Sequence, residues 1–159
     1  MTPSRKGVYA ALAARLKANL VTTPVTSFAF VTVEPKLRDW DSVPGAEMPY
    51  LGIAMSGGER TEPLSPVHLV PTRWHLLPTG WLYVRTQGDR GDPQPILTDA
   101  LDAIEAALVP DVGQQFQTLG GLVYSARLQG IVETDEGSLG ALAVAHVHFE
   151  VVVDSGGFA

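Results

Sequence analysis

The sequence predicts an α+β domain in which two helices cover one face of a mainly antiparallel sheet and the chain ends in a long β-hairpin. Two amphipathic segments with helical periodicity are separated by stretches of alternating apolar residues, and clusters of glycine and proline stand between these stretches. The length of 159 residues suits a single domain, taken as residues 1–159. A domain of this size can bury a hydrophobic core without disulfides or metals.

The first helix is expected from Pro3 to Leu20. Val8, Leu12 and Leu16 follow one another at four-residue spacing, which is typical of a buried helix face. The positively charged, alanine-rich start is similar to a signal peptide, but basic residues interrupt its apolar part and no small-residue cleavage site follows. We therefore expect a folded helix in a protein made in the cytosol.

Strands are expected over 27–34 and 50–56, because apolar and β-branched residues fill both stretches. The segment 56–71, "SGGERTEPLSPVHLVP", has three prolines, two glycines and no periodicity, and it predicts a long loop that is mobile or engaged with a partner. Strand character returns in "TRWHLLPTGWLYVRTQ". There, Pro78 and Gly80 predict a bulge, an edge position or a bend.

The second helix, "PILTDALDAIEAALVP", carries the clearest apolar stripe of the chain, formed by Leu97, Leu101, Ile104 and Leu108. The segment 122–153 then predicts a hairpin of two long strands around "DEGSLG". Residues 154–159 are expected to be a flexible tail.

Composition and charge exclude several classes of function. The chain has no cysteine, which rules out disulfides, thiolate metal sites and cysteine nucleophiles. Its net charge is −6 and it has no cluster of basic residues, which argues against binding to a nucleic-acid backbone. No apolar run approaches the roughly 18 residues that a membrane-spanning helix needs.

Two histidines and a glutamate alternate along the last predicted strand. His146, His148 and Glu150 share one strand face, a spacing that also suits a transition-metal site. The preceding strand repeats the pattern with Arg127 and Gln129, so the two strands together predict one sheet with a core side and a wet or interface side. The core side is formed by the apolar residues Ala145, Val147, Phe149, Val151 and Val153.

Other candidate chemistry is weak, and the sequence predicts no enzyme and no cofactor. Asp99, Asp102 and Glu105 spread around the second helix rather than converge, as expected for a solvated face. The glycine pairs lack the spacing of phosphate-binding loops. No serine, histidine and acid combination matches a known nucleophile pattern.

Five segments in a fixed order give the chain a family resemblance. They are "VYAALAARLKANL", "KLRDWDSVPGAEMPYLGIAM", "RWHLLPTGWLYV", "PILTDALDAIEAAL" and "QTLGGLVYSARLQGIVETDEG", and together they cover nearly the full length. In this order and spacing the chain resembles the tail terminator (tail-completion) proteins of long-tailed bacteriophages. A departure is the proline-rich segment 56–71, in which the usual charged character is thin.

The resemblance implies a structural virion protein that assembles in the host cytoplasm as a ring, expected to be a hexamer. Such a ring sits on the last ring of tail-tube protein, stops its growth and presents the surface that joins the head–tail connector or neck. DNA passes through the channel without specific binding, which an acidic protein favours. No membrane and no cofactor are implied.

Two groups of residues are then candidates for contacts. The subunit-interface or channel candidates are Arg38, Trp40, Arg127, Gln129, His146, His148 and Glu150. The partner-docking candidates in the predicted loop are Glu59, Arg60, Glu62 and His68.

Three alternatives stay open at the level of sequence. The chain could be another phage neck or tail-tube component, or a metal-binding module or enzyme that uses His146 and His148. A small-molecule-binding α+β domain is a third possibility, although the sequence has no pocket signature.

Overall fold

The fold is built on one 13-residue strand, β10 (Leu142–Asp154), which lies at the centre of the sheet. The computed structural model describes residues 3–18, 21–22, 27–62, 73–86, 91–130, 132–135 and 140–154. On one side, β10 pairs antiparallel with β7 (Thr79–Arg85) and then with β6 (Arg73–Leu76), in one continuous register. On the other side it pairs with β9 (Glu133–Asp135) and β8 (Ser125–Leu128).

The outer strands extend this centre to eight strands within the described residues. β4 (Tyr50–Ala54) pairs antiparallel with β7, and β5 (Glu59–Glu62) pairs antiparallel with β6. β3 (Thr32–Glu34) adds a parallel partner to β4, so the sheet is mixed but mostly antiparallel. A separate short ladder joins β1 (Val21–Thr22) to β2 (Ser27–Phe28).

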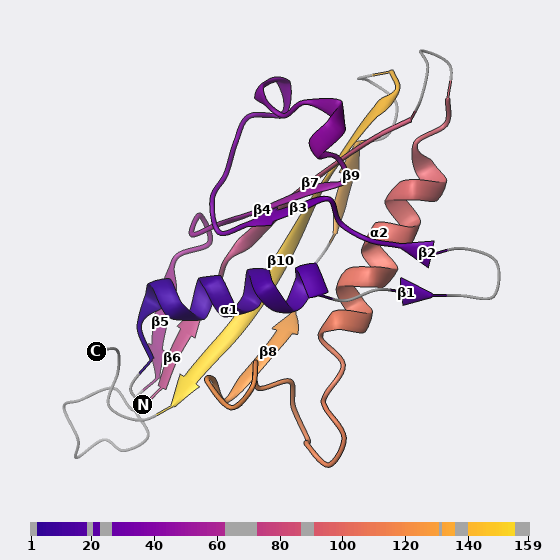
Figure 1. Cartoon of the computed structure of the whole chain (residues 1–159). Helices are drawn as coiled ribbons and strands as arrows, with labels where there is room; N and C mark the ends of the chain where they lie inside the picture. Colours follow the sequence, from indigo (N-terminus) through magenta and orange to yellow (C-terminus); the bar gives the residue numbers. More distant parts are fainter. Residues whose placement is uncertain are drawn as a thin grey trace, which may run out of the picture.

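Both helices pack on one face of the sheet, and Figure 1 shows α1 crossing in front of β10 and α2 to its right. α1 (Arg5–Ala18) and α2 (Gln94–Ala107) contribute the apolar stripes expected from their spacing. The shared core is formed by side chains from both helices and from the inner face of the sheet, among them Val8, Leu12, Leu16, Leu97, Ile104, Leu51, Leu82, Val147, Phe149 and Val151. The predicted α+β class is therefore confirmed. Neither described helix is long and apolar enough to cross a membrane.

The second face of the sheet, expected to be a wet or interface side, is apolar at one end. Val43, Met48, Tyr50, Tyr83 and Leu142 form a small separate cluster there. The segment that covers it contains two short 3-10 helices, η1 (Trp40–Ser42) and η2 (Gly45–Glu47). The even-numbered residues of β10 thus face apolar groups at one end of the strand and charged groups at the other.

Several predicted boundaries were wrong. The strand expected over 27–34 is divided between β2 and β3, and the one expected over 50–56 ends at Ala54. The loop expected over 56–71 contains β5, while residues 63–71 lie outside the described part of the chain. Asp154, which was expected to begin the flexible tail, still belongs to β10, and residues 155–159 are not described.

The interruption predicted at Pro78 is seen as a break between β6 and β7 in the middle of the sheet, whereas Gly80 lies within β7. Gly80 faces the core, and a Cβ atom there would lie 2.8 Å from the ring of Phe149. A larger residue would therefore push this ring out of the core.

Candidate functional site

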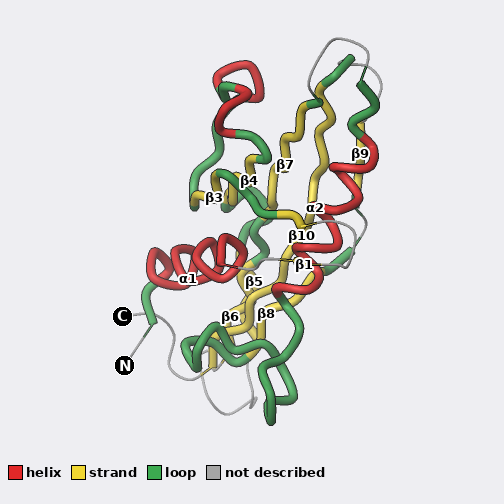
Figure 2. The backbone as a smooth tube through the Cα atoms, turned by 45° about the vertical axis from the view of Figure 1, so that its right-hand side comes forward, coloured by secondary structure: helices red, strands yellow, loops and turns green. Residues whose placement is uncertain are grey.

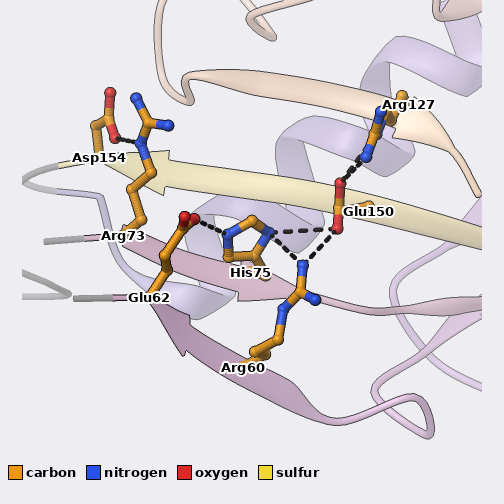
Figure 3. Close-up of polar contacts among 7 residues, drawn as sticks. All are labelled: Arg60, Glu62, Arg73, His75, Arg127, Glu150 and Asp154. Atoms are coloured by element: carbon orange, nitrogen blue, oxygen red, sulfur yellow. Dashed lines mark hydrogen bonds and ion pairs between the residues drawn. The ribbon is translucent and has the colours of Figure 1, made fainter. Parts of the chain in front are cut away.

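Seven polar side chains gather on the sheet face opposite the helices, and Figure 3 shows them on four adjacent strands. We call them the ionic cluster: Arg60, Glu62, Arg73, His75, Arg127, Glu150 and Asp154. Strand register brings them together, because directly opposed residues share a sheet face. Arg60 is opposite His75, and Arg127 is opposite Glu150.

Glu150 is the centre of the ionic cluster and is only 2% exposed. Its Oε1 accepts hydrogen bonds from Nε and Nη2 of Arg127, at 2.9 and 2.6 Å. Its Oε2 accepts one from Nη2 of Arg60 at 3.3 Å and lies 3.2 Å from Nδ1 of His75. Burial raises the pKa of Glu150, but the hydrogen bonds from Arg127 and His75 outweigh it and hold this pKa below its ordinary value.

His75 connects the two halves of the cluster through both ring nitrogens. Nε2 lies 3.0 Å from Oε2 of Glu62. Nδ1 lies 3.2 Å from both Nη2 of Arg60 and Oε2 of Glu150. Arginine only donates, so an unprotonated Nδ1 accepts from Arg60, whereas a protonated Nδ1 donates to Glu150. The proton on Nδ1 therefore decides which of the two neighbours the ring binds.

The geometry suits a cross-strand tie and does not suit acid–base chemistry. A carboxylate offers about four lone-pair positions, and with a proton on Nδ1 of His75 the four contacts of Glu150 occupy them. A carboxylate with a lowered pKa and no vacant position is a poor general acid or base near neutral pH. At the end of β10, Arg73 and Asp154 form an ion pair of 2.7 Å. The hydrogen bond to Asp154 raises the pKa of Arg73. Together these contacts join β5, β6, β10 and β8.

The three alternating residues of the last strand do not converge. The ring centroid of His146 lies 3.8 Å from that of Trp81, and its Nδ1 lies 3.5 Å from Oε2 of Glu133. His148 lines a shallow hollow of about 290 Å³ with Gln129, whose backbone N–H donates to its carbonyl at 2.8 Å. Within the described ranges, no three histidine or acidic side chains form a group that could hold a metal ion.

Three of the four expected docking residues, Glu59, Arg60 and Glu62, lie in β5 and not in a loop. Glu59 points to the helix side, where its carboxylate pairs with both Nε and Nη2 of Arg5. These hydrogen bonds lower the pKa of Glu59. Arg60 and Glu62 belong to the ionic cluster on the other face, and His68 lies outside the described residues.

Glu150 was expected to face a neighbouring subunit or the channel, and the structure encloses it within its own chain. Its arginine partners reach the surface instead, with 59% of the Arg60 side chain and 66% of the Arg127 side chain exposed. Around Glu150, the groups that this face exposes are therefore the two guanidinium groups. The interface role of the face stays a prediction.

The other two candidates, Arg38 and Trp40, lie in the segment over the second apolar cluster. Arg38 forms ion pairs with Glu34 and Glu47, and its guanidinium lies 5.0 Å from the ring centroid of Tyr50. Tyr83 donates to the carbonyl of Arg38 at 2.9 Å. Trp40 lies two positions after Arg38 and is 44% exposed.

The two tyrosines beneath this segment are expected to titrate late. Their rings stack with centroids 5.4 Å apart, and burial is the main reason why the pKa of Tyr50 and the pKa of Tyr83 each rise to about 12. Because the unfolded chain ionises near pH 10, the stability from these groups is fully present below pH 10 and is lost as the pH rises through 12. Tyrosinate absorbance should show this late phase in the native protein and a smaller one in the Tyr50→Phe/Tyr83→Phe variant, which keeps Tyr9, whose pKa burial also raises. A native protein whose tyrosines all ionise near pH 10 would contradict it.

Sequence reasoning missed His75, Arg73 and Asp154. A usable signal was present, since Arg73 and His75 alternate in "RWHL" as His146 and His148 do in the last strand. Without the pairing of β6 with β10, however, the sequence does not show that this alternation meets Glu150.

Comparison with models of known protein families and with curated proteins finds no match. The functional assignment therefore depends on the fold, the contacts of the ionic cluster and the resemblance of the five sequence segments.

Proposed function

We propose that the protein is a phage tail terminator, a structural subunit that forms a ring on the end of the tail tube, stops tube polymerisation and presents the joining surface for the head or neck. The observation that carries this proposal is the state of Glu150. The most deeply buried charge of the ionic cluster is used entirely to bind strands together. This use of the buried carboxylate favours a structural role over a catalytic one.

The order of the five resembling segments supports the same assignment. The first and fourth segments contain most of α1 and most of α2, and the third contains β6 and most of β7. The second contains the 3-10 segment and β4, and the fifth enters the hairpin with β10. Each segment thus coincides with a unit that builds the two-layer fold or covers its second face.

The charge distribution fits a ring through which DNA slides. The net charge is −6, and each arginine of the ionic cluster is paired with a carboxylate of its own chain. A surface of this kind offers no run of unpaired cations to hold a phosphate backbone. DNA would therefore pass without specific binding.

Native mass spectrometry and negative-stain microscopy of the purified chain test the proposal. We expect one closed oligomer, a hexamer, that appears as rings with a central opening and arrests tube growth when added to assembling tails. Long tubes would instead indicate a tail-tube protein. A monomer at micromolar concentration would overturn the proposal, as would stoichiometric zinc or manganese in protein purified without a histidine tag.

A further inference from the structure

Two loops at opposite ends of the molecule carry exposed apolar side chains on hydrogen-bonded frames. The Trp40 loop (residues 36–49) lies at the top of Figures 1 and 2, and the segment 109–124, here called the lower loop, lies at the bottom. The exposed apolar side chains are Leu37 and Trp40 in the first loop, and Val109, Val112, Phe116 and Tyr124 in the second. Exposed apolar groups on ordered loops are typical of contact surfaces.

The lower loop is held in shape from within. Gln117, only 1% exposed, donates through Nε2 to the carbonyl of Val109 at 2.8 Å and accepts through Oε1 from the N–H of Leu119 at 2.9 Å. An ion pair of 2.9 Å between Arg15 and Asp111 ties the loop to α1. The loop is therefore organised before any partner binds, which lowers the entropic cost of binding.

The lower loop surrounds a hollow of about 660 Å³ that includes Phe116, Thr118 and Tyr124 in its wall. This volume lies in the range in which proteins hold small organic groups, roughly 300–1,000 Å³. The one carboxylate among the lining residues is Asp111, and Arg15 already pairs with it. The rest of the polar lining consists of amide and hydroxyl groups that can donate hydrogen bonds.

A cation that is paired with Asp154 lies next to Tyr124, one of the residues in the wall of the hollow. The guanidinium of Arg73 is 4.5 Å from the ring centroid of Tyr124. The hollow therefore combines aromatic walls with donors and a nearby positive charge, a combination that suits an aromatic side chain flanked by carboxylates.

The Trp40 loop presents such a group. Asp39 and Asp41 flank Trp40, and neither carboxylate has an ion pair within the described part of the chain. The loop is also fixed, because Ser42 donates to the carbonyl of Asp39 through its N–H at 3.0 Å and through its hydroxyl at 2.8 Å. Trp40 is thus a rigid, partly apolar projection with acidic neighbours.

We propose that Trp40 of one copy inserts into the hollow of the lower loop of the next copy, with Asp39 and Asp41 facing Arg73 and the donors of the wall. Projection and hollow lie on different ends of one chain, so the contact is head-to-tail and closes into a ring when the rotation between copies allows it. The inference rests on the proposed ring function and assigns the surfaces that build the ring.

Cysteine cross-linking tests the contact directly, because the chain has no cysteine of its own. Asp41→Cys and Gln115→Cys single variants, mixed and mildly oxidised, should give a disulfide-linked dimer. The double variant Asp41→Cys/Gln115→Cys should give a ladder that ends at the number of subunits in the ring. The matched control replaces Asp41→Cys by Asp102→Cys, an exposed position on α2, and should give no dimer with Gln115→Cys.

Association is measured in parallel by native mass spectrometry. Trp40→Ala and Phe116→Ala should each weaken assembly by at least tenfold without loss of folding, since both side chains are more than a third exposed. Val31→Ala removes an equally exposed apolar side chain outside both loops and should leave assembly unchanged.

The outcomes separate this inference from the proposed function. Rings that form normally in Trp40→Ala and give no Asp41–Gln115 dimer would overturn the surface assignment and leave the ring intact. A dimer formed by Gln115→Cys alone would overturn the head-to-tail arrangement. A wild-type chain that stays monomeric would overturn both.

Discussion

Replacing Glu150 by alanine is expected to lower the free energy of unfolding by about 3 kcal/mol, since removal of one partner from a buried charged group leaves the others unpaired. Arg127 and Arg60 lose a common acceptor, and His75 loses one of its two carboxylate neighbours. The exposure of both arginines keeps the cost below that of a fully buried pair, because water can solvate their free guanidinium groups. Urea unfolding measures the change.

The substitution Glu150→Gln removes the negative charge and nearly keeps the shape of the side chain. It should also change how the free energy of unfolding falls as the pH is lowered. The folded-state pKa of Glu150 lies below its ordinary value of 4.5. Its stabilisation is therefore present above about pH 4.5 and is lost as the pH falls through the folded pKa. The variant should be less stable at neutral pH and lose less stability on acidification than the wild type.

The matched control is Glu133→Gln. Glu133 lies on the same sheet face, but 69% of its side chain is exposed and its contact with His146 is long, at 3.5 Å. Its replacement should change stability by less than about 0.5 kcal/mol. Equal effects at Glu133 and Glu150 would show that the ionic cluster contributes no specific stability.

Gly57→Ala is expected to cost about 3 kcal/mol or more, by breaking the turn between β4 and β5. A Cβ atom at this position would lie 1.8 Å from the carbonyl oxygen of Leu77, so the turn has to move away from the break between β6 and β7. The movement would break the hydrogen bond of 3.0 Å from the Leu77 N–H to the Gly58 carbonyl and loosen β5. Arg60 and Glu62 would then leave the ionic cluster.

Hydrogen exchange resolves this effect by region, with protection expected to fall first in β5 and β6. Gly45→Ala is the control, because its Cβ atom would meet only the Arg85 side chain at 3.7 Å, an ordinary contact. It should alter stability by less than about 0.5 kcal/mol. Uniform loss of protection across the sheet, or an unchanged β5, would contradict the assigned role of Gly57.

The parts of the fold that could be predicted are those in which periodicity and burial agree. The stripe on α2 and the alternation of Val147 and Phe149 on β10 describe a face packed against one core, and the structure places both there. The segment 27–34 is equally apolar but divides into β2 and β3, because each part pairs with a different strand. Local pattern does not show which partner a strand takes.

The same limit explains the ionic cluster. β5 has the sequence "ERTE", which is charged, short and flanked by glycine and proline, so it has low strand propensity. Ladder hydrogen bonds with β6 and ion pairs to Arg5, His75 and Glu150 hold it in the sheet. These contacts are long-range, and a single sequence does not reveal them.

The position of β10 in the chain has a consequence for folding. Its four partner strands all precede it, and it forms the middle of the sheet. During synthesis the earlier strands therefore have no centre to join until residues 142–154 have left the ribosome. Until then their apolar edges stay unpaired. Completion of the sheet depends on contacts distant in sequence, which makes folding slow and exposes the nascent chain to aggregation.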